Sequence, residues 1–79
     1  MQGVLLLKVA QGRDSYAQTQ KIATEARKLP GVTDSFSVLG RYDNVVFIEA
    51  KDFQTLRQYA RRVASLEGIK ASETLCEAD

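Results

Sequence analysis

One short pattern occurs twice in this chain, 37 residues apart, and it constrains the fold more than any other feature. Leu29–Val32 reads Leu-Pro-Gly-Val and Leu66–Ile69 reads Leu-Glu-Gly-Ile, each after a segment of helical periodicity and before a strand-like one. Proline moves its predecessor out of the helical region and glycine permits the exit turn, so both copies predict a helix end. We therefore expect two similar halves, each with a helix that leads into a strand.

The first half begins with Val4–Ala10, an almost continuous apolar run that predicts a strand buried on both faces and closed by a turn at Gln11–Asp14. A helix is predicted from Ser15, which fits a capping box with Gln18. Its apolar stripe consists of Ile22, Ala26 and Leu29, with Tyr16, Ala17 and Ala23 alongside. In Val32–Leu39 the period changes to two, which predicts a strand with Val32, Phe36 and Val38 on a drier face that Asp34 interrupts.

The second half repeats this order. Val45–Ala50 predicts a strand that is apolar on both faces, and Asp52 is a good N-cap for the helix after it. That helix carries its apolar residues at Phe53, Leu56, Ala60 and Val63. Ile69–Cys76 predicts a last, more polar strand. The order βαββαβ with right-handed crossovers predicts an α+β, ferredoxin-like sandwich, in which a four-stranded antiparallel sheet carries two helices on one face.

Apolar residues are also predicted on the face of the sheet that the helices leave open. Val4, Leu6, Val45 and Phe47 lie on that face, and such a patch is unfavourable in water. A chain of 79 residues forms one domain, residues 1–79, with a thin core that a partner chain can support. We therefore predict a homodimer that packs sheet against sheet, with Lys8 and Glu49 at its wetter rim or paired across it.

Composition excludes several classes of function. The chain has no histidine and one cysteine, Cys76, so histidine-dependent catalysis and a zinc site are excluded, and we expect no catalytic residue, metal or cofactor. A net charge of +1 gives no global electrostatic argument for nucleic acid or an acidic membrane. The N-terminus has no basic n-region and the apolar runs are too short for a bilayer, so a cytoplasmic protein is expected.

The stretch Gly40–Asp43 is the first place to look for a small-molecule site. It lies between two apolar runs, where glycine followed by aspartate predicts a tight reversal between strands. It can be a plain turn, or it can offer a carboxylate for an ammonium group beside backbone amides for a carboxylate. Ser72 and Thr74 on the last strand are either ordinary strand polarity or hydroxyl groups at a subunit interface that help to hold a ligand.

Together, the two helix exits, Gly-x-Tyr-Asp at Gly40–Asp43 and the closing Ser72–Leu75 resemble the effector-binding (RAM) domain of the Lrp/AsnC family of transcription regulators. The resemblance covers essentially the whole chain. It implies dimers formed through the sheets, rings of dimers, and small effectors, typically amino acids, bound between dimers. Carried over by position, the ligand-binding residues are Gly40, Arg41, Tyr42, Asp43, Ser72 and Thr74.

Family regulators also carry an N-terminal helix-turn-helix, whereas this chain starts at the first strand of the effector domain. We therefore expect a stand-alone, oligomeric sensor of an amino acid or similar metabolite. It would act through assembly or through a partner such as a full-length regulator or an enzyme, without contacting nucleic acid directly. The alternatives are a small dimeric ferredoxin-like enzyme and an assembly subunit without a ligand.

Overall fold

A computed structural model describes residues 1–10 and 15–78, without the side chain of Ser15, and confirms the predicted order of elements. The first half contains β1 (Gln2–Val9), α1 (Ser15–Arg27) and β2 (Val32–Ser37). The second half contains β3 (Asn44–Glu49), α2 (Phe53–Ala64) and β4 (Ile69–Cys76). The predicted turn at residues 11–14 and the capping box of Ser15 lie outside the described part of the chain.

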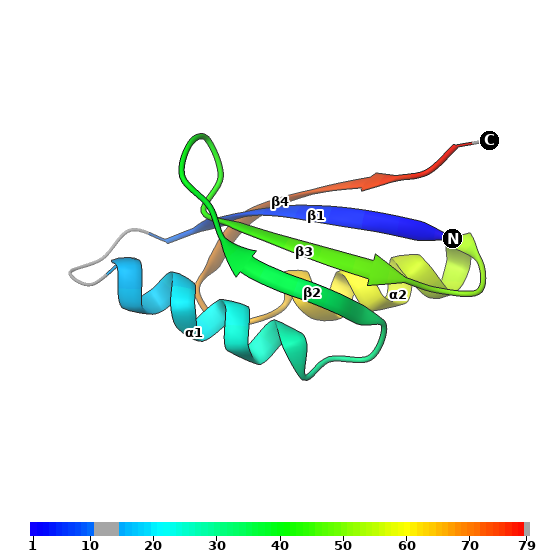
Figure 1. Ribbon diagram of the computed structural model, residues 1–79, viewed down its shortest axis with the longest axis horizontal. Coiled ribbons are helices and arrows are strands. Elements are labelled where there is room, and N and C mark those ends of the chain that lie inside the picture. The colour runs from blue at the N-terminus through cyan, green and yellow to red at the C-terminus, as the bar shows by residue number, and fades with distance from the viewer. Residues whose placement is uncertain (11–14, 79) are drawn as a thin grey trace.

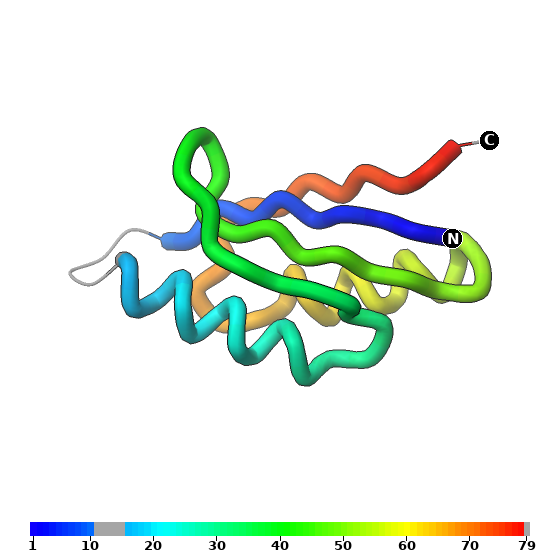
Figure 2. Tube along the Cα trace, in the orientation of Figure 1, coloured from blue at the N-terminus to red at the C-terminus, as the bar shows by residue number. Residues whose placement is uncertain are grey.

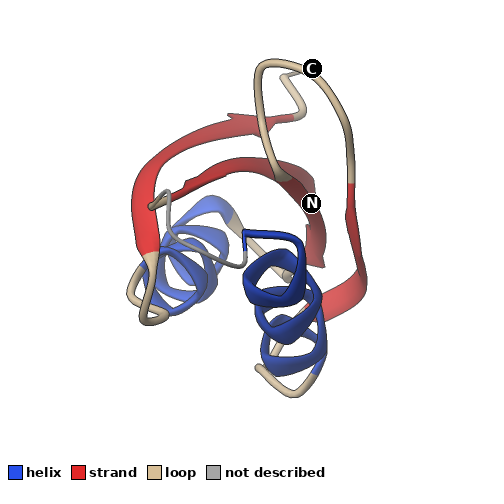
Figure 3. Ribbon diagram, turned by 90° about the vertical axis from the view of Figure 1, so that its left-hand side faces the viewer, coloured by secondary structure: helices blue, strands red, loops and turns tan. Residues whose placement is uncertain are grey.

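The four strands form one antiparallel sheet in the order β2-β3-β1-β4, and both helices cover the same face of it (Figure 1, Figure 3). The ferredoxin-like α+β sandwich is therefore confirmed. The chain trace brings both termini to one end of the sheet, while the loop between β2 and β3 rises at the other end, on the side away from the helices (Figure 2). No helix in the described residues is long and apolar enough to cross a membrane.

The core lies between the sheet and the two helices. Its members come from alternate positions of the two central strands and from one face of each helix, namely Leu5, Leu7, Val9, Ile22, Ala26, Val46, Ile48, Leu56, Ala60 and Val63. The predicted helical stripes begin one turn later than expected. Tyr16 is 72% exposed and Phe53 50%, whereas Thr19 and Leu56 are buried. The first turn of each helix therefore adds little to the core.

Both predicted helix exits are present and have the same geometry. Gly31 and Gly68 adopt positive φ angles of 82° and 96°, a region that favours glycine because it has no Cβ. The next residue closes each turn, because the amide of Val32 donates to the carbonyl of Leu29 and the amide of Ile69 to the carbonyl of Leu66. The internal repeat therefore exists in the backbone as well as in the sequence.

The prediction of which β2 residues form its drier face is wrong. Ser35 is fully buried toward the helices, whereas Phe36 is 40% exposed on the opposite face. A β-bulge causes the change: Val32 pairs with Ile48 and Asp34 with Phe47, so that Thr33 is an extra residue in the ladder. One extra residue reverses the faces of every later residue in a strand. Asp34 therefore does not interrupt a buried stripe.

Candidate functional site

The loop between β2 and β3, residues 38–43, forms one corner of the candidate site. It is longer than the predicted tight reversal and rises above the open face of the sheet (Figure 1). The amide of Val38 donates to the carbonyl of Asp43 at 3.0 Å and closes the base of the loop. Gly40 has a φ of 133°, a conformation that residues with a Cβ rarely adopt. Nothing lies within 4 Å of the position that a Cβ would take, so glycine is favoured there by the backbone conformation and not by lack of space.

Asp43 holds this loop against the end of β1. Its amide donates to the carbonyl of Leu7 at 2.8 Å, and its Oδ2 accepts a hydrogen bond of 2.8 Å from the amide of Val9. The residue is half-buried. One carboxylate oxygen of Asp43 is thus used to satisfy a backbone amide where β1 ends, and this oxygen has a structural role.

Tyr42 connects the same loop to β4. Its hydroxyl donates a hydrogen bond of 3.1 Å to Oε1 of Glu73. This bond and the negative charge of Glu73 favour the neutral phenol and raise the pKa of Tyr42, while the nearby cation of Arg41 opposes the change. Glu73 pairs with Leu6, which places it on the open face of the sheet. The loop, a phenol and an exposed carboxylate therefore meet above β4.

Ser72 and Thr74 lie on the other face of β4. They pair with Leu7 and Leu5, whose side chains point toward the helices. Both are nevertheless exposed, because β4 is the edge strand and the helices leave this part of it uncovered. Within one chain, Tyr42 therefore contacts Glu73 and not these two hydroxyl residues. Glu73 was not among the residues predicted for the site. Strand alternation puts it on the face opposite to Ser72 and Thr74, but only the fold brings it to Tyr42.

The apolar patch predicted on the open face is present. Val4, Leu6 and Val45 are half-buried and Phe47 is 40% exposed. Because of the bulge, Phe36 joins this face, and its ring centroid lies 6.0 Å from that of Phe47. Leu75, which pairs with Val4 and is 50% exposed, extends the patch onto β4. The open face is thus more apolar than the four predicted residues indicated.

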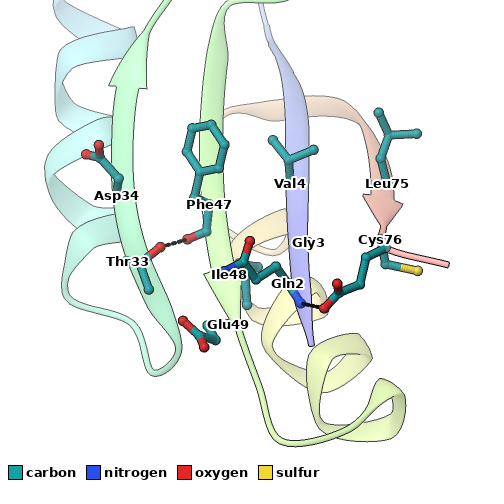
Figure 4. Close-up of a pocket in the computed structure, with 11 residues that line it drawn as sticks. Gln2, Gly3, Val4, Thr33, Asp34, Phe47, Ile48, Glu49, Leu75 and Cys76 are labelled. Atoms are coloured by element: carbon teal, nitrogen blue, oxygen red, sulfur yellow. Dashed lines mark hydrogen bonds between the residues drawn. The ribbon is translucent and has the colours of Figure 1, made fainter. Parts of the chain in front are cut away.

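A hollow of about 550 Å³ lies on the same face, near the two termini (Figure 4). Val4, Phe47 and Leu75 form its apolar floor, and the acidic residues Asp34, Glu49 and Glu77 stand around it. Of these three, Glu77 is tied to β1, because it accepts a hydrogen bond of 2.7 Å from the amide of Gln2. This hollow is at the end of the sheet opposite the Gly40–Asp43 loop.

The described residues contain no group of three or more histidine, cysteine or acidic side chains that could hold a metal ion. Cys76 is a free, exposed thiol at the end of β4. The groups that the candidate site at the loop offers are hydrogen-bond donors, carboxylates and an aromatic wall, which suit binding of a small polar molecule.

Residues 4–76 match the family described as the Lrp/AsnC ligand binding domain. This chain belongs to that family. It is 30% identical over 71 residues to the HTH-type transcriptional regulator FL11 of Pyrococcus furiosus, a match that covers 90% of this chain and 44% of the regulator. The chain thus spans less than half of that relative.

Two solved structures extend this comparison. TTHA0845 from Thermus thermophilus superimposes with a TM-score of 0.78 at 29% identity, covering 94% of this chain and 88% of the other. The regulator NMB0573 of Neisseria meningitidis, solved in complex with L-Met, has the same fold, with a TM-score of 0.73 at 17% identity over 94% of this chain and 47% of the other. The chain is therefore a ligand-binding domain of the Lrp/AsnC family, and the relatives that it matches include transcriptional regulators.

Proposed function

We propose that this Lrp/AsnC domain binds an amino acid or a similar small zwitterion beside the Gly40–Asp43 loop, at a contact between subunits. The observation that carries the proposal is the hydrogen bond from Tyr42 to Glu73, which fastens the loop over the open sheet face next to exposed carboxylate groups. A loop fixed on a rigid sheet is a suitable place for specific recognition of a small molecule.

Each end of a zwitterion has suitable partners at this loop. Oδ1 of Asp43 has no hydrogen bond among the described residues, so it is available to accept from the ammonium. Glu73, which Tyr42 joins to the loop, supplies a second carboxylate on the same face of the sheet. The backbone amides of Gly40 and Arg41 bind the carboxylate, and Tyr42 forms a wall. Ser72 and Thr74 reach the ligand from a neighbouring subunit, since they face away from the loop in their own chain.

The functional unit in this proposal is a homodimer joined through Val4, Leu6, Val45 and Phe47, which assembles further into larger oligomers. Exposed apolar side chains across the open face support it, because monomeric proteins rarely leave such patches in water. The amino-acid class is supported by the L-Met complex of the Neisseria relative. In this proposal residues 1–79 form a single ligand-binding domain, which acts through a partner regulator or enzyme.

A thermal-shift screen of the twenty amino acids tests this proposal. A ligand at a hundred times its Kd adds about 2.7 kcal/mol of stability, so a true effector produces a clear rise in Tm. Calorimetry on the hit then compares the native chain with Glu73→Gln and Tyr42→Phe, and both variants should bind more weakly. Glu67→Gln is the matched control, because Glu67 is an exposed carboxylate in the turn between α2 and β4.

Asp43→Ala is a less informative variant, since it also removes the acceptor for the amide of Val9 and should destabilise the fold. If no amino acid raises the Tm while the chain remains oligomeric, it is an assembly subunit without a ligand. If an effector binds Glu73→Gln as tightly as the native chain, the proposed position of the site is wrong.

A further inference from the structure

The outer face of α2 carries arginine residues without acidic partners. The helix contains Arg57, Arg61 and Arg62 but no aspartate or glutamate, and all three arginines are exposed. The two ion pairs in the part of the chain that the structure describes lie elsewhere, at Glu77 and at Glu25. Among the described residues, therefore, no carboxylate forms an ion pair with the positive charges of α2.

Helix stability explains only part of this charge. Cations in the last turn of a helix interact favourably with its macrodipole, which accounts for Arg61 and Arg62. Arg57 lies in the second turn, toward the positive end of the helix, where a cation gains nothing from the dipole. Arg57 and Arg61 are also four residues apart, a spacing at which like charges on one helix face repel each other. An anion from outside the chain would relieve this repulsion.

A small hollow lies on the same side of α2, opposite the buried residues of the helix. Its volume is about 130 Å³, and it is lined by Gln54, Arg57, Gln58 and Arg61. Each of these side chains ends in N–H donors, and a guanidinium can donate two parallel hydrogen bonds to one carboxylate. Arg57 and Arg61 are about 6 Å apart along the helix axis. The hollow therefore suits the oxygen atoms of an anion.

The surroundings of this hollow favour the carboxylates of a protein over the phosphates of a nucleic acid. The neighbouring groove, between α1 and the turn after α2, contains Glu25 and Glu67 beside Lys21. A nucleic acid lying across the helices would bring its phosphates close to these two carboxylates, and like charges that meet at an interface lower the affinity. A single helix, about 10 Å across, can follow α2 without covering that groove.

We propose that Gln54, Arg57, Gln58 and Arg61, the α2 arginine face, bind an acidic helix of a partner protein whose carboxylates are spaced one helical turn apart. Carboxylates at that spacing match the separation of Arg57 and Arg61 along α2. This inference rests on the partner regulator or enzyme of the proposed function and adds the surface at which that partner binds. The Gly40–Asp43 loop rises on the side of the sheet away from the helices, so partner and effector can bind at the same time (Figure 1).

Fluorescence anisotropy with a synthetic peptide tests this proposal. The probe is a labelled, alanine-based helix with three glutamates one turn apart, and the control peptide has the same three glutamates spread around the helix. At low salt the native chain should bind the probe on the order of tenfold more tightly than the control peptide. Arg57→Gln/Arg61→Gln should lose about tenfold in affinity for the probe. Lys21→Gln/Lys70→Gln, which removes two exposed cations elsewhere, should bind the probe as the native chain does.

Circular dichroism first establishes that both double variants are folded. Equal losses of affinity in the two double variants overturn the proposal, because total charge then governs binding. Equal affinity for the two peptides, or no saturable binding of the probe, overturns it as well. A duplex DNA oligomer that binds more tightly than the probe, and more weakly to Arg57→Gln/Arg61→Gln, shows that phosphates occupy this face instead. The effector should raise the Tm of that variant as much as it raises the Tm of the native chain, so the effector site is tested separately.

Discussion

At the scale of single residues, Gly31 shows how one position can carry both a backbone and a packing requirement. Its φ is 82°, and a Cβ there would overlap the ring of Tyr59 on α2. Gly31→Ala should therefore lower the free energy of unfolding by roughly 2–4 kcal/mol, from backbone strain and overpacking together. Urea unfolding followed by circular dichroism measures this change.

Gly40 provides the matched control for that experiment. It also needs a positive φ, but nothing lies within 4 Å of the Cβ position, so Gly40→Ala should show the backbone strain alone. Equal losses in the two variants would show that Tyr59 adjusts without cost. The double variant Gly31→Ala/Tyr59→Ala should lose less unfolding free energy than the two single variants together, because the overlap between the new Cβ and the ring is removed.

At the scale of elements, α2 begins at a cap whose strength depends on pH. Oδ1 of Asp52 accepts a hydrogen bond of 2.8 Å from the amide of Thr55, and this bond lowers the pKa of Asp52. A lowered pKa in the folded state means that the cap stabilises the chain fully above the unfolded pKa, about 3.9, and is lost as the pH falls through the folded value.

Asp52→Ala should therefore lower the Tm at pH 7, while the difference from the native chain should become smaller in acid. Differential scanning calorimetry at pH 7 and at about pH 3 tests both statements. Asp52→Asn retains an oxygen acceptor, so its Tm at pH 7 should fall less than that of Asp52→Ala. Because the amide does not ionise, this variant should also remove most of the pH dependence that the cap adds to the Tm. A Tm difference between native chain and Asp52→Ala that is constant over this range would mean that the ionised cap is unimportant.

Side chains cover backbone groups at the outer edge of β2, one of the two edge strands. On β2, Asp34 accepts from the amide of Ser35 at 2.8 Å, and Arg27 of α1 donates to the carbonyl of Ser35 at 2.6 Å. Side chains thus occupy backbone groups along an edge that could otherwise pair with another chain. This role explains Asp34, which the alternating pattern alone made look out of place in the strand.

At the scale of the whole molecule, a polar substitution on the open apolar face should lower the mass of the assembly in solution, because it weakens the proposed dimer. Phe47→Gln should weaken the proposed dimer on the order of a hundredfold, because two aromatic rings per dimer lose their burial. Folding of the single chain should change little, since the ring is 40% exposed there. Tyr16→Gln is the matched control, an aromatic residue that is 72% exposed on α1, away from this face. A Phe47→Gln chain that stays dimeric at nanomolar concentration would contradict the sheet-to-sheet contact.

Local chemistry in the sequence determined the element order, both helix exits, the cap at Asp52 and the core faces of β1 and β3. These features depend on neighbours along the chain, which is why periodicity and turn chemistry were sufficient to predict them. The ferredoxin-like fold follows from them once the repeat is recognised. The family resemblance drawn from Gly40–Asp43 and the helix exits was also correct.

Tertiary structure decided what depends on contacts between distant segments. The bulge at Thr33 set which residues of β2 face the helices, because strand register is fixed by pairing with β3 and is not visible in β2 alone. Likewise, only the folded chain brings Tyr42 to Glu73 and the carboxylate of Asp43 to the amide of Val9. The sequence thus determined the repeated framework, whereas long-range pairing determined which polar groups of the candidate site are free to bind a ligand.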